Sequence, residues 1–300
     1  MNNFPNKTLA VLVGPTGIGK SALGIQIASY FHTEIISCDS RQIFREMSVG
    51  TAVPPVEIRN QVRHHFIHSH SIFEKYNASM FETEVLDILP QLFVNHDIVL
   101  MTGGSMLYID AVCKGIDDLP DIDPELREGL KERMKTEGIE SLRNELKLVD
   151  PDYYHETDLH NPVRIIHALE IFYSTGLPFS SQRTKTQKER DFRIVKIGLN
   201  RDRTELYDRI NQRVDEMMAD GLEQEAKSLY PHRHLNTLNT VGYRELFEHF
   251  DGITSLSEAV EKIKANSRKY ARKQLTWFRR DQAIQWFHPD QVQDVLNVLK

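Results

Sequence analysis

Cysteine is scarce in this chain of 300 residues, and the two present, Cys38 and Cys113, are far apart in sequence and stand in apolar surroundings. So few cysteines exclude a disulfide framework and a cysteine-rich metal site, and they are typical of a protein kept in a reducing compartment. Long apolar runs are also missing, since no segment approaches the roughly 18 apolar residues of a membrane span. The N-terminus carries no secretory signal pattern. We therefore expect a cytoplasmic protein with no membrane partner.

Acidic residues are missing from one segment, Lys262 to Arg280, which contains eight lysines or arginines although the net charge of the chain is −6. This asymmetry predicts a local surface for a polyanion. The alternative, a solvated helix face, would normally mix both signs. Within the segment, Lys264, Arg268 and Arg272 share one helical face, where we expect phosphate contacts.

A second set of residues in this segment recurs every seven positions and is expected to pack in the core: Ile263, Tyr270 and Trp277. For Trp277, stacking on a nucleobase is the alternative to packing.

Short, apolar, β-branched runs that end at glycine, aspartate or threonine predict buried parallel strands at Thr8 to Val13, Glu34 to Cys38 and Asp97 to Met101. Helical sequence separates them, which indicates an α/β fold with a P-loop NTPase-like, doubly wound parallel sheet. Ligands bind such sheets beyond the carboxyl ends of the strands, where Gly14, Asp39 and Thr102 fall.

The middle of the chain has a different, charged and helical character. We expect a P-loop core domain with C-terminal helices at 1–116 and 191–300, and a helical insertion at 117–190. Asp123 and Asn161 each precede a proline and are predicted helix caps, and Gly176 and Gly221 are predicted helix ends. A strand is expected at Phe192 to Leu199, and from Thr204 onward the sequence predicts almost only helix.

One motif carries strong chemical information because it matches the pattern G-x-x-x-x-G-K-[ST] between an expected strand and an expected helix. Its residues are Gly14, Pro15, Thr16, Gly17, Ile18, Gly19, Lys20 and Ser21. Backbone N–H groups of such a loop turn toward phosphate oxygens at a helix start, Lys20 adds a full charge, and Ser21 can hold Mg²⁺. A glycine turn without a ligand is the alternative.

The neighbouring strands distinguish this chain from a common NTPase. The strand that ends at Met101 leads into Thr102-Gly103-Gly104-Ser105, with no carboxylate. The best-placed acid is Asp39, in a group of four residues that offer a base, a hydroxyl, a cation and an amide: Asp39, Ser40, Arg41 and Gln42. Capping the following turn, or holding Mg²⁺ through water, is the alternative role for Asp39.

Together these motifs resemble the bacterial tRNA dimethylallyltransferase family, also called isopentenyl-diphosphate:tRNA transferases. The matching pieces follow the family's order through nearly the whole chain: Gly14 to Ser21, Asp39 to Phe44, Gly50-Thr51-Ala52, Gly103 to Tyr108, Arg127, Asn161-Pro162 with Arg164, Gly242-Tyr243-Arg244, and Arg272 to Trp277.

The resemblance implies transfer of a dimethylallyl group from dimethylallyl diphosphate to N6 of adenosine 37 in tRNAs that read codons starting with U. It implies that Asp39 is the general base, that the loop from Gly14 to Ser21 holds the donor diphosphate with Mg²⁺, and that Ser105 contacts the reacting end of the tRNA. The catalytic set would be Asp39, Lys20 and Ser105. The insertion would close over the anticodon stem-loop.

The implied tRNA contacts extend beyond the catalytic turn. They are Asp39, Ser40, Arg41, Gln42, Ser105, Arg127, Arg164, His167, Arg244, Arg268, Arg272, Lys273 and Gln274. Val53, Phe44 and His167 depart from common family residues. Longer members carry a C-terminal zinc finger, which two cysteines cannot form. We expect a monomer.

A histidine cluster at 64, 65, 68 and 70 has metal-like spacing, but no cysteine or paired acid completes a known site. A structural role is therefore the favoured interpretation.

Three rival functions remain open at this stage: a kinase for a small acceptor, a prenyltransferase that uses free AMP, and a non-catalytic RNA-binding module with a vestigial P-loop.

Overall fold

The structure is a computed structural model that describes residues 4–117, 119, 123–183 and 187–300. The chain folds into two compact units, Met1–Lys114 with Glu189–Lys300 as unit 1 and Gly115–Lys188 as unit 2. The helical insertion was expected at 117–190, and its positions 118, 120–122 and 184–186 lie outside the described residues.

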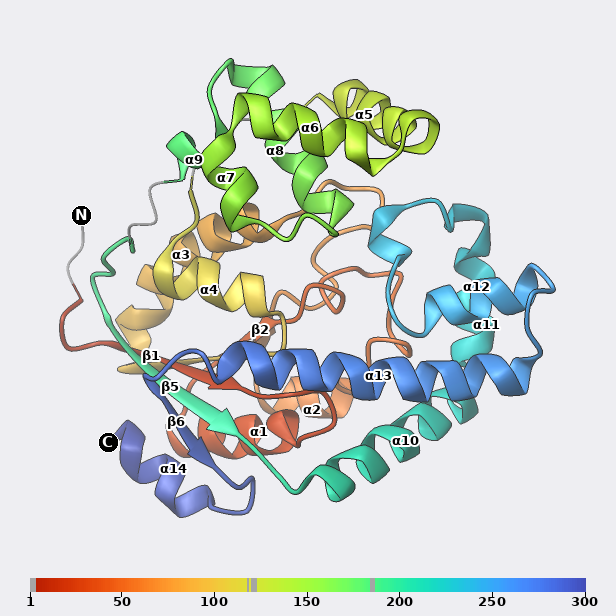
Figure 1. Cartoon of the computed structure of the whole chain (residues 1–300). Helices are drawn as coiled ribbons and strands as arrows, with labels where there is room; N and C mark the ends of the chain where they lie inside the picture. Colours follow the sequence, from red (N-terminus) through yellow and green to blue (C-terminus); the bar gives the residue numbers. More distant parts are fainter. Residues whose placement is uncertain (1–3, 118, 120–122, 184–186) are drawn as a thin grey trace. The chain divides into compact units, whose positions relative to one another are not determined.

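Unit 1 contains a parallel sheet, which within the described residues has six strands in the order β3-β2-β4-β1-β5-β6. Figure 1 shows this sheet, with β1, β2, β5 and β6 labelled. The strands are β1 Thr8–Val13, β2 Ile35–Cys38, β3 His64–His65, β4 Ile98–Gly103, β5 Arg193–Leu199 and β6 Ile284–Phe287. β1 occupies the centre, with Thr8 paired to Ile98 of β4 on one side and to Arg193 of β5 on the other. The expected α/β fold with a doubly wound parallel sheet is confirmed.

Helices cover both faces of this sheet. The helices of unit 1 are α1 Lys20–Tyr30, α2 Val56–Gln61, α3 Ala78–Asn95, α4 Met106–Lys114, α10 Arg203–Ala219, α11 Leu222–Leu229, α12 Tyr243–Phe250, α13 Leu256–Phe278 and α14 Val292–Leu299. Of these, α11 and α12 pack with α10 and α13 in a separate apolar cluster. Two short 3₁₀ turns, η1 Tyr230–His232 and η2 Asn236–Leu238, follow α11.

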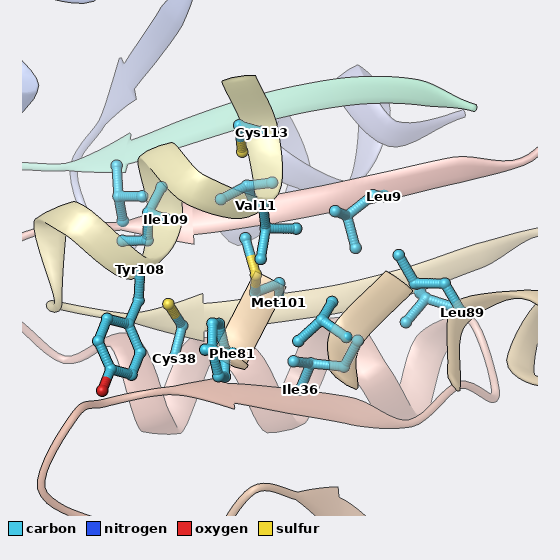
Figure 2. Packing of buried hydrophobic residues seen from close by; sticks show 14 of the residues in the cluster. Leu9, Val11, Ile36, Cys38, Phe81, Leu89, Met101, Tyr108, Ile109 and Cys113 are labelled. Carbon is cyan, nitrogen blue, oxygen red and sulfur yellow. The ribbon is translucent and has the colours of Figure 1, made fainter. Parts of the chain in front are cut away.

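The strand β1 shows how the two faces are built. Successive side chains of a strand point to opposite faces. Leu9 and Val11 therefore pack with α3 and α4 (Figure 2), whereas Ala10 and Leu12 pack with α1 and α10. All six residues of β1 are buried, so it forms a continuous apolar run, as a central parallel strand should.

One expectation for the C-terminal region is wrong. The sequence after Thr204 predicted almost only helix, but β6 adds a parallel edge strand, with Lys196 of β5 opposite Ile284. β6 has only four residues and one of them is buried, so its pattern is too short to be distinguished from helix. The predicted end at Gly221 is confirmed, because α10 stops at Ala219 and Gly221 has φ 98°.

Unit 2 is helical and has its own core. Its helices are α5 Pro124–Glu137, α6 Ile139–Val149, α7 Pro151–Glu156, α8 Pro162–Thr175 and α9 Phe179–Gln182. The predicted caps are confirmed, since Asp123 and Asn161 accept hydrogen bonds from the backbone N–H of Glu125 and Val163. Gly176 ends α8 in the left-handed conformation. Leu142, Leu146 and Leu169 are fully buried in the core of this unit.

None of the helices in the described ranges is both long and apolar enough to cross a bilayer.

Candidate active site

The G-x-x-x-x-G-K-[ST] motif forms the predicted loop between β1, which ends at Val13, and α1, which begins at Lys20. Gly17 and Gly19 have φ values of 77° and 111°, which side-chain-bearing residues rarely adopt. A Cβ atom on Gly17 would also lie 2.8 Å from Cγ1 of Ile210 on α10. Glycine is therefore required both by the backbone conformation and by the approach of α10.

Gln274 of α13 ties this loop to the loop that follows β4. Its Oε1 accepts from the backbone N–H of Thr16 at 2.9 Å, and its Nε2 donates to the carbonyl oxygen of Gly104 at 2.8 Å. Gln274 is 2% exposed. These bonds give Gln274 a structural role between two loops, and the predicted RNA contact stays a prediction.

Asp39 directly follows β2 and caps its own turn with one oxygen. Its Oδ1 accepts from the backbone N–H groups of Arg41 at 2.9 Å and Gln42 at 3.3 Å. The backbone N–H of Ser40 donates to Oγ of Ser105 at 2.7 Å, so the turns after β2 and β4 hold each other. Capping and base chemistry are compatible, because a carboxylate has a second oxygen with its own lone pairs.

A cavity of about 400 Å³ brings most of the predicted catalytic residues together within unit 1. Those lining it include Thr16, Lys20, Ser21, Asp39, Ser40, Arg41, Gln42, Ser105, Arg244 and Gln274. The helices α10 and α13 supply an apolar part of the lining, with Ile210, Val214 and Ile263. The cavity thus combines cations, a carboxylate and an apolar wall.

Two residues of this cavity were missed by sequence reasoning. Arg213 of α10 and Tyr270 of α13 both line it. Tyr270 was expected to pack in the core, which is wrong for a side chain that faces the cavity. A signal for Arg213 did exist, because the core positions Ile210 and Val214 place it beside the buried stripe of α10.

Two cations of the cavity, Lys20 and Arg213, are poorly solvated. Burial, together with the charge of Arg213, lowers the pKa of Lys20 from 10.5 to about 7, although Asp39 opposes the shift. The Nζ atom of Lys20 donates to the carbonyl oxygens of Gly14 at 2.9 Å and Pro15 at 2.8 Å. Burial also lowers the pKa of Arg213, and among the described residues its guanidinium forms no ion pair. Buried, incompletely paired cations favour the binding of an anion.

The basic segment on α13 is divided by its contacts. Lys264 forms ion pairs with Asp215 and Glu261, and Arg268 donates to Asn211. Arg272 lines a second hollow of about 660 Å³, whereas Lys273 is exposed.

Both ends of the apolar set on α13 pack as expected. Ile263 is buried, and Trp277 packs on the core and donates from Nε1 to Oδ2 of Asp110 at 2.8 Å.

Three predicted RNA contacts lie in unit 2. Arg127 forms a bidentate pair with Glu170, at 2.6 Å from Nε to Oε1 and 2.8 Å from an NH2 atom to Oε2. Nδ1 of His167 lies 3.5 Å from Oε2 of the same carboxylate, which is fully buried. Arg164 is exposed on α8. Arg127 and His167 are therefore brought together by one acid.

The histidines of the cluster at 64, 65, 68 and 70 do not share one partner. Nδ1 of His64 lies 2.7 Å from the carbonyl oxygen of Val62, and Nε2 of His65 lies 2.6 Å from Oε2 of Glu34. In the described part of the chain, no group of three or more His, Cys, Asp or Glu residues has an arrangement suited to a metal ion.

A phosphate-binding loop and an aspartate at the carboxyl edge of a parallel sheet define a P-loop enzyme of the α/β class. A family model described as IPP transferase matches residues 42–281. The chain belongs to the IPP transferase family.

Curated relatives match over nearly the whole chain. A protein named tRNA dimethylallyltransferase 1 from Bacteroides fragilis is 56% identical over 294 residues, with 98% of both chains covered. Another of that name, from Porphyromonas gingivalis, is 57% identical over 283 residues, with 94% of both chains covered.

Solved structures agree with the fold. The crystal structure of a full-length tRNA isopentenylpyrophosphate transferase from Bacillus halodurans is 32% identical, covers 98% of this chain and 95% of its own, and has a TM-score of 0.70. A eukaryotic dimethylallyltransferase acting on tRNA shares the fold, with a TM-score of 0.77 at 24% identity and coverage of 96% and 75%.

Proposed function

We propose that this protein transfers a dimethylallyl group from dimethylallyl diphosphate to N6 of adenosine 37 in tRNAs that read codons starting with U. The observation that carries the proposal is the single cavity that contains a phosphate-binding loop, two poorly solvated cations, a carboxylate and an apolar wall. Names of relatives more than 50% identical over nearly the full chain support the same reaction.

The donor would bind with its diphosphate at the P-loop. Backbone N–H groups at the start of α1, Lys20 and Arg213 together offer partial and full positive charge to the two phosphates. Ile210, Val214 and Ile263 offer the apolar surface that a five-carbon chain requires. The donor class thus follows from a site that is cationic in one part and apolar in another.

Mg²⁺ prefers oxygen ligands and keeps several waters. The oxygen donors near the loop fit this preference, because the hydroxyls of Thr16 and Ser21 and the carboxylate of Asp39 line one cavity. Ser21, with phosphate oxygens of the donor, would hold the ion. The ion would supply further neutralisation of the diphosphate charge.

The reaction forms a bond from N6 of adenine to C1 of the dimethylallyl group and breaks the bond from C1 to the diphosphate oxygen. The bonding electron pair leaves with the diphosphate, which Lys20 and Arg213 stabilise. The amine loses one proton, which Asp39 accepts. The cavity holds the amine in line with the breaking bond.

RNA binding would use cations other than the two that hold the donor. The proposed contacts are Lys273 and Arg272 on α13, Arg244 in the lining of the cavity, and Arg127 and Arg164 in unit 2. Each phosphate contact releases counterions, so binding should weaken as salt rises. We infer that unit 2 clamps the anticodon stem-loop, which requires that substitution of the exposed Arg164 weakens tRNA binding without changing the affinity for the donor.

The decisive experiment incubates the purified protein with labelled dimethylallyl diphosphate, Mg²⁺ and a tRNA that reads U-starting codons. Nucleoside analysis should recover N6-isopentenyladenosine. Labelled product from free AMP, or phosphoryl transfer from ATP without RNA, would instead support one of the rival enzymes. An Asp39→Ala protein that binds tRNA normally but makes no product would exclude a purely binding function.

A further inference from the structure

Glu225 of α11 lies outside the catalytic turn, yet four donors converge on its carboxylate. Oε2 accepts from the backbone N–H groups of Ser48 at 2.9 Å and Val49 at 2.8 Å. Oε1 accepts from the backbone N–H of Gly50 at 2.9 Å and from the hydroxyl of Tyr243 at 2.6 Å. Three successive N–H groups around one anion form a nest, a tight way to hold a loop.

The loop that Glu225 holds needs such support. A Cβ atom on Gly50 would lie 2.6 Å from the hydroxyl oxygen of Tyr243, so only glycine allows this approach. Ala52 has φ 49°, a conformation that alanine disfavours. A strained residue persists only when its surroundings fix it, and the contacts of Glu225 with Ser48 to Gly50 end two residues before Ala52.

The next two carbonyl groups of this loop determine how Gln42 is oriented. Nε2 of Gln42 donates to the carbonyl oxygens of Thr51 at 3.0 Å and Ala52 at 3.1 Å. Oε1 accepts from the hydroxyl of Ser37 at 3.2 Å. The reversed amide would place Oε1 against two carbonyl oxygens, so the orientation is unambiguous. Both hydrogens of Nε2 are used, and the remaining capacity of Gln42 is a lone pair on Oε1.

We infer that Glu225 is a positioning residue that makes Gln42 a hydrogen-bond acceptor for the exocyclic amine of the target base. This inference rests on the proposed function. Gln42 lines the cavity, and its backbone N–H donates to Oδ1 of Asp39 at 3.3 Å, so the acceptor and the proposed base share one turn.

An amine has two N–H bonds, of which one proton passes to Asp39 and the other stays on the product. Oε1 of Gln42 accepts the hydrogen that stays. A base with a 6-oxo group, or with no group there, offers no such hydrogen and is rejected.

The test compares two stem-loop RNAs that differ only at the target base, adenosine in one and purine riboside, which lacks the amine, in the other. Affinities are measured with the full chain, alongside single-turnover transfer to adenosine. The wild-type protein should prefer the adenosine RNA by more than about tenfold, since the amine donates to both Gln42 and Asp39. Gln42→Leu should lower this ratio by about tenfold, the value of one hydrogen bond.

Glu225→Gln keeps the size of the side chain but replaces one acceptor oxygen with a donor group. It should lower the ratio at least threefold and slow transfer, while the KM for the donor changes less than twofold. Glu223→Gln, a matched change on the same helix, should leave the ratio unchanged. Tyr243→Phe removes one of the four donors and should lower the ratio less than Glu225→Gln does, which gives a second measurement if Glu225→Gln does not fold.

Equal affinity of the wild-type protein for both RNAs would overturn the inference. So would a Glu225→Gln protein in which the affinities for both RNAs and the donor KM all change by the same factor, since that outcome describes a loss of general stability. Failure of the wild-type protein to transfer any prenyl group would instead overturn the proposed function, and the affinity ratio would still report on Gln42.

Discussion

The cavity has two walls of different origin. One, which we call the strand wall, consists of the turns after β1, β2 and β4 and carries Lys20, Asp39 and Ser105. The other, the helix wall, is formed by α10 and α13 and carries Arg213 and Gln274. In the strand wall the backbone itself sets the geometry, because parallel strands end at one edge of the sheet. In the helix wall, side chains of α10 and α13 supply charge and close the cavity. Their placement depends on how these two helices pack against the sheet.

The strand wall should carry the largest effect on chemistry. Lys20→Ala removes a cation from the leaving diphosphate, and we expect single-turnover transfer at saturating donor to slow by about 10²–10³-fold. Asp39→Ala should be no more damaging, because the proton leaves late in the reaction. Lys227→Ala, on the exposed side of α11, serves as the control. If the Lys20→Ala protein retains most of its activity, the helix wall stabilises the leaving diphosphate without the charge of Lys20.

Gln274→Ala tests whether the two walls depend on each other for stability. The change leaves the N–H of Thr16 and the carbonyl oxygen of Gly104 without their partner. Because unpaired buried groups cost about 1–3 kcal/mol, the free energy of unfolding should fall by about 2–3 kcal/mol. Urea denaturation measures this, with Gln293→Ala on the exposed face of α14 as the comparison. A change below about 0.5 kcal/mol would show that the loops hold themselves.

The difference between the walls also explains what could be predicted from the sequence. The bounds of β1 were predicted correctly, and Gly14, Asp39 and Thr102 were expected at one edge of the sheet because each follows a predicted strand. The set of Lys20, Asp39 and Ser105, which lines one cavity, came from the family resemblance. The bonds of Gln274 to Thr16 and Gly104 were not predicted, because they join residues far apart in the chain, which no local pattern reveals.

The missed elements are short or depend on tertiary contacts. β3 has two residues and β6 has four, so neither spans enough sequence to show a period. Arg213 belongs to no motif, and its only signal was its position between the core residues Ile210 and Val214, which does not show that the side chain lines a cavity. The proposed role of Glu225 was equally hidden, since the backbone groups that it binds, at Ser48 to Gly50, lie 175 or more residues away.

Arg213→Ala should separate binding from chemistry on the helix wall. The guanidinium is proposed to bind the donor, and a hydrogen bond to a charged group contributes about 1.5–3 kcal/mol. We therefore expect the KM for dimethylallyl diphosphate to rise by about thirtyfold, with a smaller effect on tRNA affinity. Arg213→Lys should recover part of the loss, and Gln212→Ala, one position away and exposed, should behave like the wild-type protein. If tRNA affinity falls while the KM for dimethylallyl diphosphate stays unchanged, Arg213 belongs to the RNA site.

The interaction between Lys20 and Arg213 predicts a pH dependence. Since the pKa of Lys20 is lowered to about 7 in the free protein, the amine is largely neutral at pH 8. A diphosphate favours the protonated form, so its binding should take up nearly one proton at pH 8 and almost none at pH 6. Affinity should fall up to tenfold per pH unit above 7. Calorimetry in two buffers of different ionisation enthalpy measures the uptake, which should shrink in Arg213→Ala because that cation helps to lower the pKa.

The same shift has a consequence for the free protein. The pKa of Lys20 is lower in the folded state than its ordinary value of 10.5, so the unfolded chain binds more protons between these values. The contribution of Lys20 to the free energy of unfolding should therefore increase as pH rises from about 7 toward 10.5. A buffer-independent heat of diphosphate binding at pH 8 would contradict both statements.

The smallest effect concerns α13 outside the cavity, where two lysines of the same helix differ in their partners. Lys264 is paired with Asp215 and Glu261, whereas Lys273 is exposed and forms no ion pair among the described residues. A lysine already neutralised by two acids can release few counterions from RNA, so the pairing decides which residue binds.

Lys273→Ala should reduce the slope of log affinity against log salt by about 0.7, the value for one contact to a single strand. Lys264→Ala should change the slope by less than half as much. Equal slopes for both variants would mean that the ion pairs of Lys264 open when RNA binds, and that the charge of the whole segment acts without regard to individual partners.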